Sequence, residues 1–416
     1  MTGDALSTRE TVSLWWRVLA VPLVTCAALA GMGQPLLGIS ILTVCYLLSL
    51  LIHWQQSSKP TLLGRAYLIF AAVTVLGCLH TQYLANSVAV AAVVVGSVVL
   101  FAVLSVYRLS ELQPLYLVIC IGNILLCGEE IYTWLRTGAI LHALGFSSLQ
   151  PFRRILNTSS SLGYSGNDAL LPLVGLGIAV LALLYSKRFG AAWSLAALSL
   201  LTSVVRLLLT TSRLVYLSCA MGLLCCIISA CIAKPRTRLA GLRELFVIGT
   251  LGVAIVLSFG AGKEVLGTAG LWKTEAQKRS GLGRLTIALR AEKLYRQYPI
   301  WGVGPGNYSY AACLEGGIDD KRCNSQALNG YLQSLTEQGP LGLLSLLFLW
   351  IGAALAVCKS FRNEHIPKSW PPVALGITVA LLLVNLGQSA FFATEMLAAT
   401  IALWLAILNA GTGEPV

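Results

Sequence analysis

The feature that most constrains this sequence is a series of apolar stretches, each continuous over roughly 18 to 22 residues, the length that crosses a bilayer as a helix. They do not alternate between polar and apolar residues as barrel strands do. Only helices and closed barrels satisfy their backbone polar groups in lipid. Composition agrees, because 56% of residues are hydrophobic and 11% are charged. The sequence therefore predicts an all-α, polytopic membrane protein.

The apolar stretches predict about twelve transmembrane helices. No small-residue cleavage site follows the first of them, so we expect it to be a retained span rather than a signal peptide. The predicted spans lie near residues 12–31, 35–53, 66–84, 87–107, 114–135, 168–186, 190–210, 214–233, 244–262, 339–357, 371–388 and 391–409.

The charged residues between the spans predict the orientation. Cytoplasmic connections of membrane proteins collect Lys and Arg, and here the basic residues fall in alternate connections. We therefore expect both termini in the cytoplasm. The basic connections contain Lys59, Arg65, Arg108, Lys187, Arg188, Lys234, Arg236, Arg238, Arg243, Lys359, Arg362 and Lys368.

This threading divides the chain into three parts. Residues 1–262 hold transmembrane helices 1–9 with a smaller outer loop near 136–168, residues 263–338 form a large outer loop, and residues 339–416 hold helices 10–12. From residue 263 to residue 339 the chain has ten Lys or Arg and seven Asp or Glu. Clustered arginines outside the membrane indicate an anionic ligand or, alternatively, ion pairs with local acids.

Several sequence motifs that would indicate a particular enzyme chemistry are missing. We find no Walker loop, HExxH, GxSxG or CxxC pattern, so the sequence predicts no ATP hydrolysis, bound metal or cofactor. Ten of the twelve cysteines lie within or at the ends of apolar spans. The other two, Cys313 and Cys323, lie in the outer loop, where they form either a disulfide or two separate thiols.

Residues 282–298 have the pattern of a helix that Pro299 ends. One face of it is apolar, and Arg290, Lys293 and Arg296 lie on the opposite face. Arg284 falls within the apolar face, where a charge needs a partner or an anionic ligand. The apolar face contains Ile287, Ala288, Ala291, Leu294, Tyr295 and Tyr298.

The helix is followed by Gly302-Val303-Gly304-Pro305-Gly306-Asn307-Tyr308. Glycines permit positive φ angles and a close approach of the backbone. Turns of this kind can offer N–H groups to phosphate oxygens, although most of them serve only as turns.

These stretches resemble the outer-loop signature of the O-antigen ligase and polymerase superfamily. The resemblance continues through Ala327-Leu328-Asn329-Gly330-Tyr331-Leu332-Gln333 into Glu337-Gln338-Gly339-Pro340-Leu341-Gly342, and covers about residues 150 to 345. Thr210-Thr211-Ser212-Arg213 is similar to a "T-x-S/T-R" turn of that family. Arg153-Arg154 with Asn167 resembles its loop before the sixth span.

The resemblance implies a GT-C type, metal-independent glycosyltransferase at the periplasmic face of the bacterial inner membrane. Its substrates would be glycans carried on undecaprenyl pyrophosphate, as donor and acceptor. Membrane lipids, a chain-length regulator and a flippase are the implied partners, and nucleic acid is not. Arginines suit a pyrophosphate leaving group because their planar fork binds phosphate bidentately. Arg213 and Arg284 best match the family's phosphate-contacting arginines, and the other candidate binding residues are Arg153, Arg154, Arg206, Arg290, Gly304, Asn307 and Asn329.

One departure bears on the subfamily. Ligases of this superfamily carry a His before the Asn of an "H-N-x-x-L" element, and this sequence has Leu328 there. This favours a polymerase of lipid-linked repeat units over a ligase that transfers the glycan to lipid A–core. Glu315, Asp319 and Asp320 are candidates for the general base by residue type. A transporter is the third reading, which the scarcity of ionisable residues inside the spans disfavours.

Overall fold

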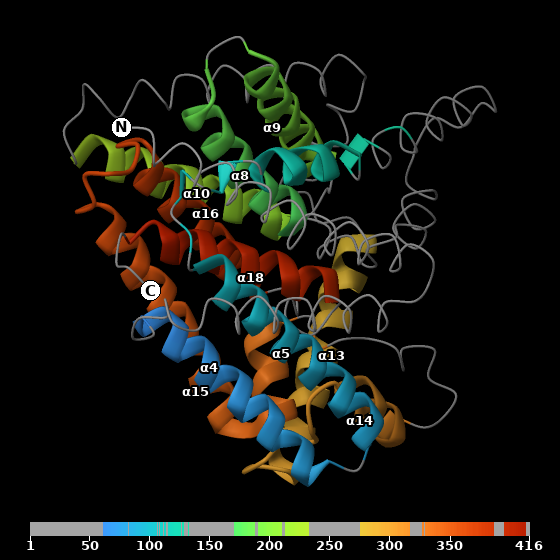
Figure 1. Ribbon diagram of the computed structural model, residues 1–416. Coiled ribbons are helices and arrows are strands. Elements are labelled where there is room, and N and C mark those ends of the chain that lie inside the picture. The colour runs from blue at the N-terminus through green and yellow to red at the C-terminus, as the bar shows by residue number, and fades with distance from the viewer. Residues whose placement is uncertain are drawn as a thin grey trace.

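The computed structural model describes residues 61–128 with single-residue gaps at 82, 106, 108, 111, 114 and 126, and then 132, 170–187, 190–209, 213–232, 275–316, 327, 329–386 and 395–412. Throughout these ranges the regular structure is helical, in agreement with the all-α prediction (Figure 1). The spans predicted near 12–31, 35–53 and 244–262 lie outside the described residues.

Each predicted span that falls within the described residues overlaps a helix, although several helix ends differ from the predicted ones. The last predicted spans, 371–388 and 391–409, correspond to α16 and α18, and an unlabelled helical stretch at Leu115–Leu125 corresponds to the predicted span 114–135. The elements are α4 (Leu62–Gly77), η3 (Cys78–His80), α5 (Leu84–Ser105), α8 (Leu170–Tyr185), α9 (Ala191–Leu209), α10 (Arg213–Ile232), α13 (Glu275–Gln297), α14 (Tyr308–Gly316), α15 (Gly330–Ser360), α16 (Trp370–Val384) and α18 (Glu395–Ala410).

Three helical segments are long and apolar enough to cross a membrane, namely Leu62–His80, Leu84–Ser105 and Gly330–Ser360. Shorter apolar helices accompany them, among them α8, α16 and most of α9, α10 and α18. A helix of 20 residues is about 30 Å long, the thickness of the hydrocarbon layer. The chain is therefore a multi-pass membrane protein.

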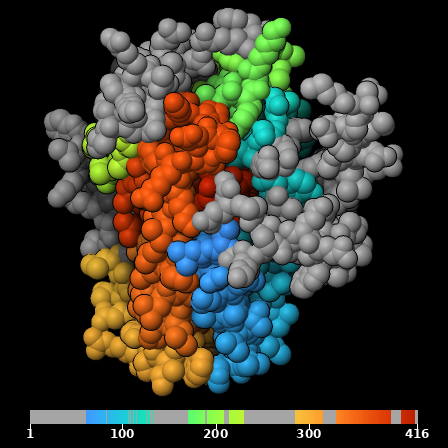
Figure 2. Space-filling view, turned by 60° about the vertical axis from the view of Figure 1, so that its left-hand side comes forward, coloured from blue at the N-terminus to red at the C-terminus, as the bar shows by residue number. Residues whose placement is uncertain are grey.

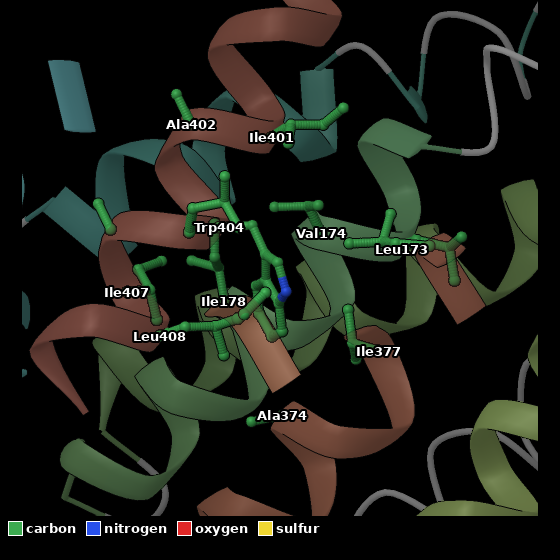
Figure 3. Packing of buried hydrophobic residues seen from close by; sticks show 14 of the residues in the cluster. Leu173, Val174, Ile178, Ala374, Ile377, Ile401, Ala402, Trp404, Ile407 and Leu408 are labelled. Carbon is green, nitrogen blue, oxygen red and sulfur yellow. The ribbon is translucent and has the colours of Figure 1, made fainter. Parts of the chain in front are cut away.

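Small residues let the helices approach closely. Gly222 of α10 and Gly376 of α16 face each other, each against the other's carbonyl oxygen. Gly177 of α8 leaves room for the Trp404 ring of α18. Figure 3 shows Trp404 between the side chains of α8 and those of α16 and α18. Its indole N–H donates to Thr378 Oγ1 at 3.2 Å, which satisfies the buried polar atom.

The helices define two ends of the bundle. At one end Thr61 Oγ1 donates to Asn409 Oδ1 at 2.6 Å and Asn363 Nδ2 donates to the Gly411 carbonyl at 3.1 Å. The start of α4, the end of α18 and the connection between α15 and α16 therefore meet there. We call it the basic end, because these segments carry Arg65, Lys359, Arg362 and Lys368. The described parts of two predicted basic connections, around Arg65 and from Lys359 to Lys368, thus lie at the same end, and the orientation in the membrane stays a prediction.

At the opposite end, α15 bends sharply. Gly339 has φ 67° and ψ −166°, and Pro340 follows it. The kink coincides with the start of the predicted span 339–357, while the helix itself begins at Gly330. Figure 2 shows α15 and α4 side by side, with parts of α13 and α14 beneath them. The kink thus separates a short first segment of α15 from the part that lies along α4.

Candidate active site

The glycine-rich segment forms a turn at the end of the bundle away from the basic end. Gly302, Gly304 and Gly306 have φ values of 69°, 95° and 75°, all in the left-handed region. A side chain at these positions would be strained. The positive φ angles expected from sequence are therefore present, and we call residues 301–307 the glycine turn.

The backbone N–H groups of the glycine turn are already used within the chain. Val303 donates to the Thr336 carbonyl at 3.0 Å and Gly304 donates to the Glu337 carbonyl at 2.8 Å. Gly302, Gly306, Asn307 and Tyr308 also donate to partners inside the protein. With Pro305 lacking an N–H, no donor from Gly302 to Tyr308 is left for a phosphate. Gly304, a candidate binding residue from the sequence, is thus engaged in holding the turn.

The glycine turn surrounds a carboxyl side chain of the protein. Glu337, on the first segment of α15, is fully buried. Its carboxylate accepts from the Gly306 N–H at 2.8 Å, the Tyr308 N–H at 3.1 Å and Gln333 Nε2 at 2.9 Å. A buried carboxylate requires such donors. Glu337 therefore fastens the glycine turn to α15.

Asn307 fastens the same turn to the connection between α4 and α5. Its Nδ2 donates to Thr81 Oγ1, to Ser87 Oγ at 2.9 Å and to the Val303 carbonyl at 3.2 Å. Ser87 Oγ in turn donates to the Pro305 carbonyl at 2.8 Å. Asn307 is fully buried, so its described contacts are structural. The predicted contact with substrate is not among them.

Beyond the glycine turn, α13 and α14 share a small hydrophobic core of their own. It confirms the predicted apolar face at Ile287, Ala291 and Leu294. The Tyr308 hydroxyl donates to the Ile287 carbonyl at 2.9 Å. Burial raises the pKa of Tyr308 to about 12, although the Arg290 guanidinium acts in the opposite direction. The phenol therefore stays protonated at neutral pH, and Arg290 lies near it at the edge of this core.

The helix α13 differs from its prediction at both ends. It begins at Glu275, seven residues before the predicted start at 282, and ends at Gln297. Ser280 and Gly281 lie inside it, because a single glycine costs a helix only about 1 kcal/mol. On its solvated face Arg296 pairs with Glu292 at 2.7 Å, with 76% and 51% of the two side chains exposed. This agrees with the predicted exposed position of Arg296.

The two arginines that best match the family, Arg213 and Arg284, lie on different helices. Arg213 is the first residue of α10, and Arg284 lies within α13. Helix α10 packs mainly against α16, whereas α13 packs against α15 and α14. Convergence of the two side chains stays a prediction.

The remaining candidates fall in three groups. Arg206, on α9, is half-buried and lies near Cys127. Asn329 caps α15, since its Oδ1 accepts from the Tyr331 and Leu332 N–H groups at 3.0 Å. Cys313 and the backbone of Glu315 belong to α14. The candidates outside the described residues are Arg153, Arg154, Asp319, Asp320 and Cys323, so the disulfide and the general base stay predictions.

Several residues of this region were not singled out from the sequence. His80 stacks on Trp301 with ring centroids 4.3 Å apart, and Tyr83 lies against Tyr310 at 4.4 Å. His80 and Tyr83 come from the connection between α4 and α5, which the sequence marks only as a short, uncharged turn, whereas Trp301 lies in the glycine turn and Tyr310 in α14. Glu337 lies in one of the stretches that resemble the family, but nothing in the sequence indicated that it is buried.

Comparison with known proteins identifies a family that part of this sequence matches. Residues 198–347 match the sequence profile of the Wzy_C family, described as O-antigen ligase. The match runs from α9 to the part of α15 beyond the kink, and so includes the Arg213 turn, α13 and the glycine turn. Comparison with curated protein sequences gives no significant match. Members of the family are membrane glycosyltransferases that act as ligases or polymerases. The chain thus carries a Wzy_C O-antigen ligase family domain over residues 198–347.

Proposed function

We propose that this protein polymerises oligosaccharide repeat units carried on undecaprenyl pyrophosphate, at the periplasmic face of the bacterial inner membrane. The observation that carries the proposal is the family domain over residues 198–347 with Leu328, rather than histidine, before Asn329. Both termini then lie in the cytoplasm, on the side of the basic end. The glycine turn lies on the periplasmic side.

The reaction joins one repeat unit to another without a metal. A hydroxyl of the acceptor glycan attacks the anomeric carbon of the donor, the bond from that carbon to the pyrophosphate oxygen breaks, and the hydroxyl proton passes to a base. Negative charge develops on the leaving pyrophosphate, and fixed positive charge stabilises it best. Arg213, at the N-terminus of α10, adds its charge to the positive end of that helix dipole. Arg284 is the second proposed ligand of the pyrophosphate.

A cell-based assay tests the proposal against its alternatives. When the gene is deleted, we expect single repeat units on lipid A–core and no ladder of longer chains. Long chains stranded on the lipid carrier would instead indicate a ligase. Absence of repeat units outside, with polymer still formed by membrane extracts, would indicate a transporter.

Arginine substitutions test the site within that assay. We expect Arg213→Ala and Arg284→Ala each to abolish chain extension. Arg296→Ala is the matched control, because its exposed pair with Glu292 contributes no more than about 1 kcal/mol. Equal losses in all three variants, at equal protein levels, would contradict a specific arginine site.

A further inference from the structure

Two aromatic pairs lie at the glycine turn and have no part in the chemistry above; three of their rings are exposed and Tyr83 is half-buried. His80 and Trp301 stack almost parallel, with an angle of 16° between ring planes and 4.3 Å between centroids. Tyr83 and Tyr310 are tilted by 50° at 4.4 Å. Both pairs join the same two segments, the connection after α4 and the stretch from the glycine turn to α14. We call these four residues the aromatic ledge.

Three of the four rings of the aromatic ledge remain exposed rather than buried in the core. Trp301 is 40% exposed and Tyr310 is 51% exposed, whereas the neighbouring Tyr308 is 1% exposed. His80 is exposed as well, and its ring nitrogens have no hydrogen-bond partner among the described residues. His80 and Tyr83 are three positions apart in the chain, which limits the distance between their Cα atoms to about 10 Å. The aromatic ledge therefore groups three exposed rings and one half-buried ring, that of Tyr83, and all four rings carry polar atoms.

The position of the aromatic ledge relative to the membrane limits the kind of ligand that it could contact. One candidate span ends at His80 and the next begins at Leu84, so the ledge lies where the helices leave the bilayer. Exposed Leu79 and Ile300 flank it. On the proposed function, the first sugars of a lipid-linked glycan would lie at this level, next to the pyrophosphate. A soluble ligand would have no reason to bind beside these apolar neighbours.

We propose that the aromatic ledge binds the sugar rings of the lipid-linked glycan next to its pyrophosphate. The C–H face of a pyranose packs well on an aromatic ring, while its hydroxyls need hydrogen-bond partners at the ring edge. His80 and the two tyrosines supply such partners. Aromatic side chains have few rotatable bonds, so ordering them on binding costs little entropy. The ledge is a binding and positioning site, and the proposal rests on the glycosyltransferase function above.

A membrane-interface role is the competing explanation, because Trp and Tyr gather at bilayer surfaces in many membrane proteins. Such anchors act singly against lipid. Here each ring is paired with a ring from a segment more than two hundred residues away, and one partner is a histidine. Exposed Tyr132 provides the matched control, since it is 63% exposed and belongs to neither pair.

The test uses the full-length protein in liposomes with lipid-linked repeat units, and measures the rate of polymerisation against substrate concentration. We expect Trp301→Leu and Tyr310→Leu to raise the apparent KM about tenfold, the ratio that the loss of one aromatic contact produces. Trp301→Phe should keep most of the affinity. His80→Phe should raise KM by a smaller factor, because it keeps the stack and removes the nitrogens. Tyr132→Leu should have no effect, and equal KM values for Trp301→Leu and Tyr132→Leu would overturn the proposal.

A second measurement separates this proposal from the proposed function. Binding of the free repeat-unit oligosaccharide is followed by saturation-transfer NMR on the same folded proteins, whose melting temperatures are checked first. Binding to the wild type that is lost in Trp301→Leu supports the ledge even if no polymer forms, in which case only the polymerase assignment fails. Equal binding by both proteins, or none by the wild type, overturns the ledge.

Discussion

Among single residues, Glu337 holds the glycine turn through its carboxyl oxygens. Glu337 receives two backbone N–H groups and one amide N–H, which is the arrangement that a phosphate would otherwise need. The positive charge for a substrate pyrophosphate must therefore come from side chains elsewhere. This is why the arginines, and not the glycine turn, carry the proposed chemistry.

The Glu337 contacts make a prediction about stability. In Glu337→Gln one carboxylate oxygen becomes an NH₂ group, so a backbone N–H of Gly306 or Tyr308 loses its acceptor. We expect the variant to unfold with a free energy lower by about 1–3 kcal/mol, the cost of a buried unsatisfied donor. Thermal unfolding in detergent measures it. Glu292→Gln, on the exposed face of α13, should melt close to the wild type, and an equal shift in both variants would contradict the role of Glu337.

Alanine substitutions at two glycines, Gly304 and Gly122, are expected to have different effects on stability. Gly304 has φ 95°, and an added Cβ would overlap Thr81 Oγ1. Gly304→Ala should therefore destabilise the protein by more than about 1 kcal/mol. Gly122, in the Leu115–Leu125 helix, has open space around an added Cβ. Gly122→Ala should be neutral or stabilising, because alanine favours a helix over glycine by about 1 kcal/mol. Melting curves of the two variants check this, and a loss at Gly122 as large as at Gly304 would contradict it.

Sequence reasoning about single residues succeeded where a local rule applied. The positive φ angles of the glycine turn and the exposed position of Arg296 both follow from local geometry. The contact of Asn307 with Thr81 joins residues 226 positions apart, and no periodicity encodes it. Long-range contacts of this kind show whether a polar residue also holds the fold together. The sequence does not reveal them, so Asn307 could be considered there only as a candidate for binding.

At the scale of elements, the kink in α15 separates the part that carries Glu337 from the part that lies along α4. An added Cβ at Gly339 would overlap the Ile300 carbonyl. The kink and the glycine turn are thus packed against each other. The predicted span 339–357 begins at this kink because Pro340 starts a new apolar run, whereas the preceding helical segment is too polar to read as a span.

The kink provides a prediction of its own. Gly339→Ala should abolish polymerisation and lower the melting temperature, because Gly339 needs a positive φ and has no room for a Cβ. Pro340→Ala is the control. Proline suits the first position of a helix, but alanine also adopts that conformation, so activity should be retained. Activity of Gly339→Ala at the wild-type level in the same assay would show that the kink is dispensable.

For some apolar helices the boundaries could be predicted from hydrophobicity alone. The predicted span 168–186 and the observed helix Leu170–Tyr185 differ by two residues or fewer at either end. In α13 the polar first turns gave no such signal, so its start was placed seven residues late. Its buried face was nevertheless right at Ala291 and Leu294, since amphipathic periodicity records which side is covered.

At the scale of the whole molecule, α10 carries Arg213 at its first residue and packs along α16 through Gly222 and Gly376. The position of Arg213 therefore depends on a helix crossing far along the same helix. The sequence shows both glycines but not that they meet, because apolar spans carry little information about their neighbours.

Disturbing this crossing should act on catalysis from a distance. In Gly376→Leu the new side chain would collide with the Gly222 carbonyl, an atom that cannot move aside without shifting α10. We expect chain extension to fall at least tenfold in the cell-based ladder, in step with lower stability. Gly128→Leu makes the same chemical change where nothing lies within 4 Å of an added Cβ, and should leave the ladder intact. Normal ladders from both variants would contradict the dependence of Arg213 on the crossing.

On the proposed function, this chain alone polymerises lipid-linked repeat units, with arginines in place of a metal. The most direct measurement uses the purified protein in liposomes with undecaprenyl-pyrophosphate-linked repeat units, lipid A–core and a chelator of divalent cations. We expect long glycans on the lipid carrier, release of undecaprenyl pyrophosphate and no product from Arg213→Ala. Transfer of single units to lipid A–core without elongation would contradict the proposed function, as would activity that disappears with the chelator.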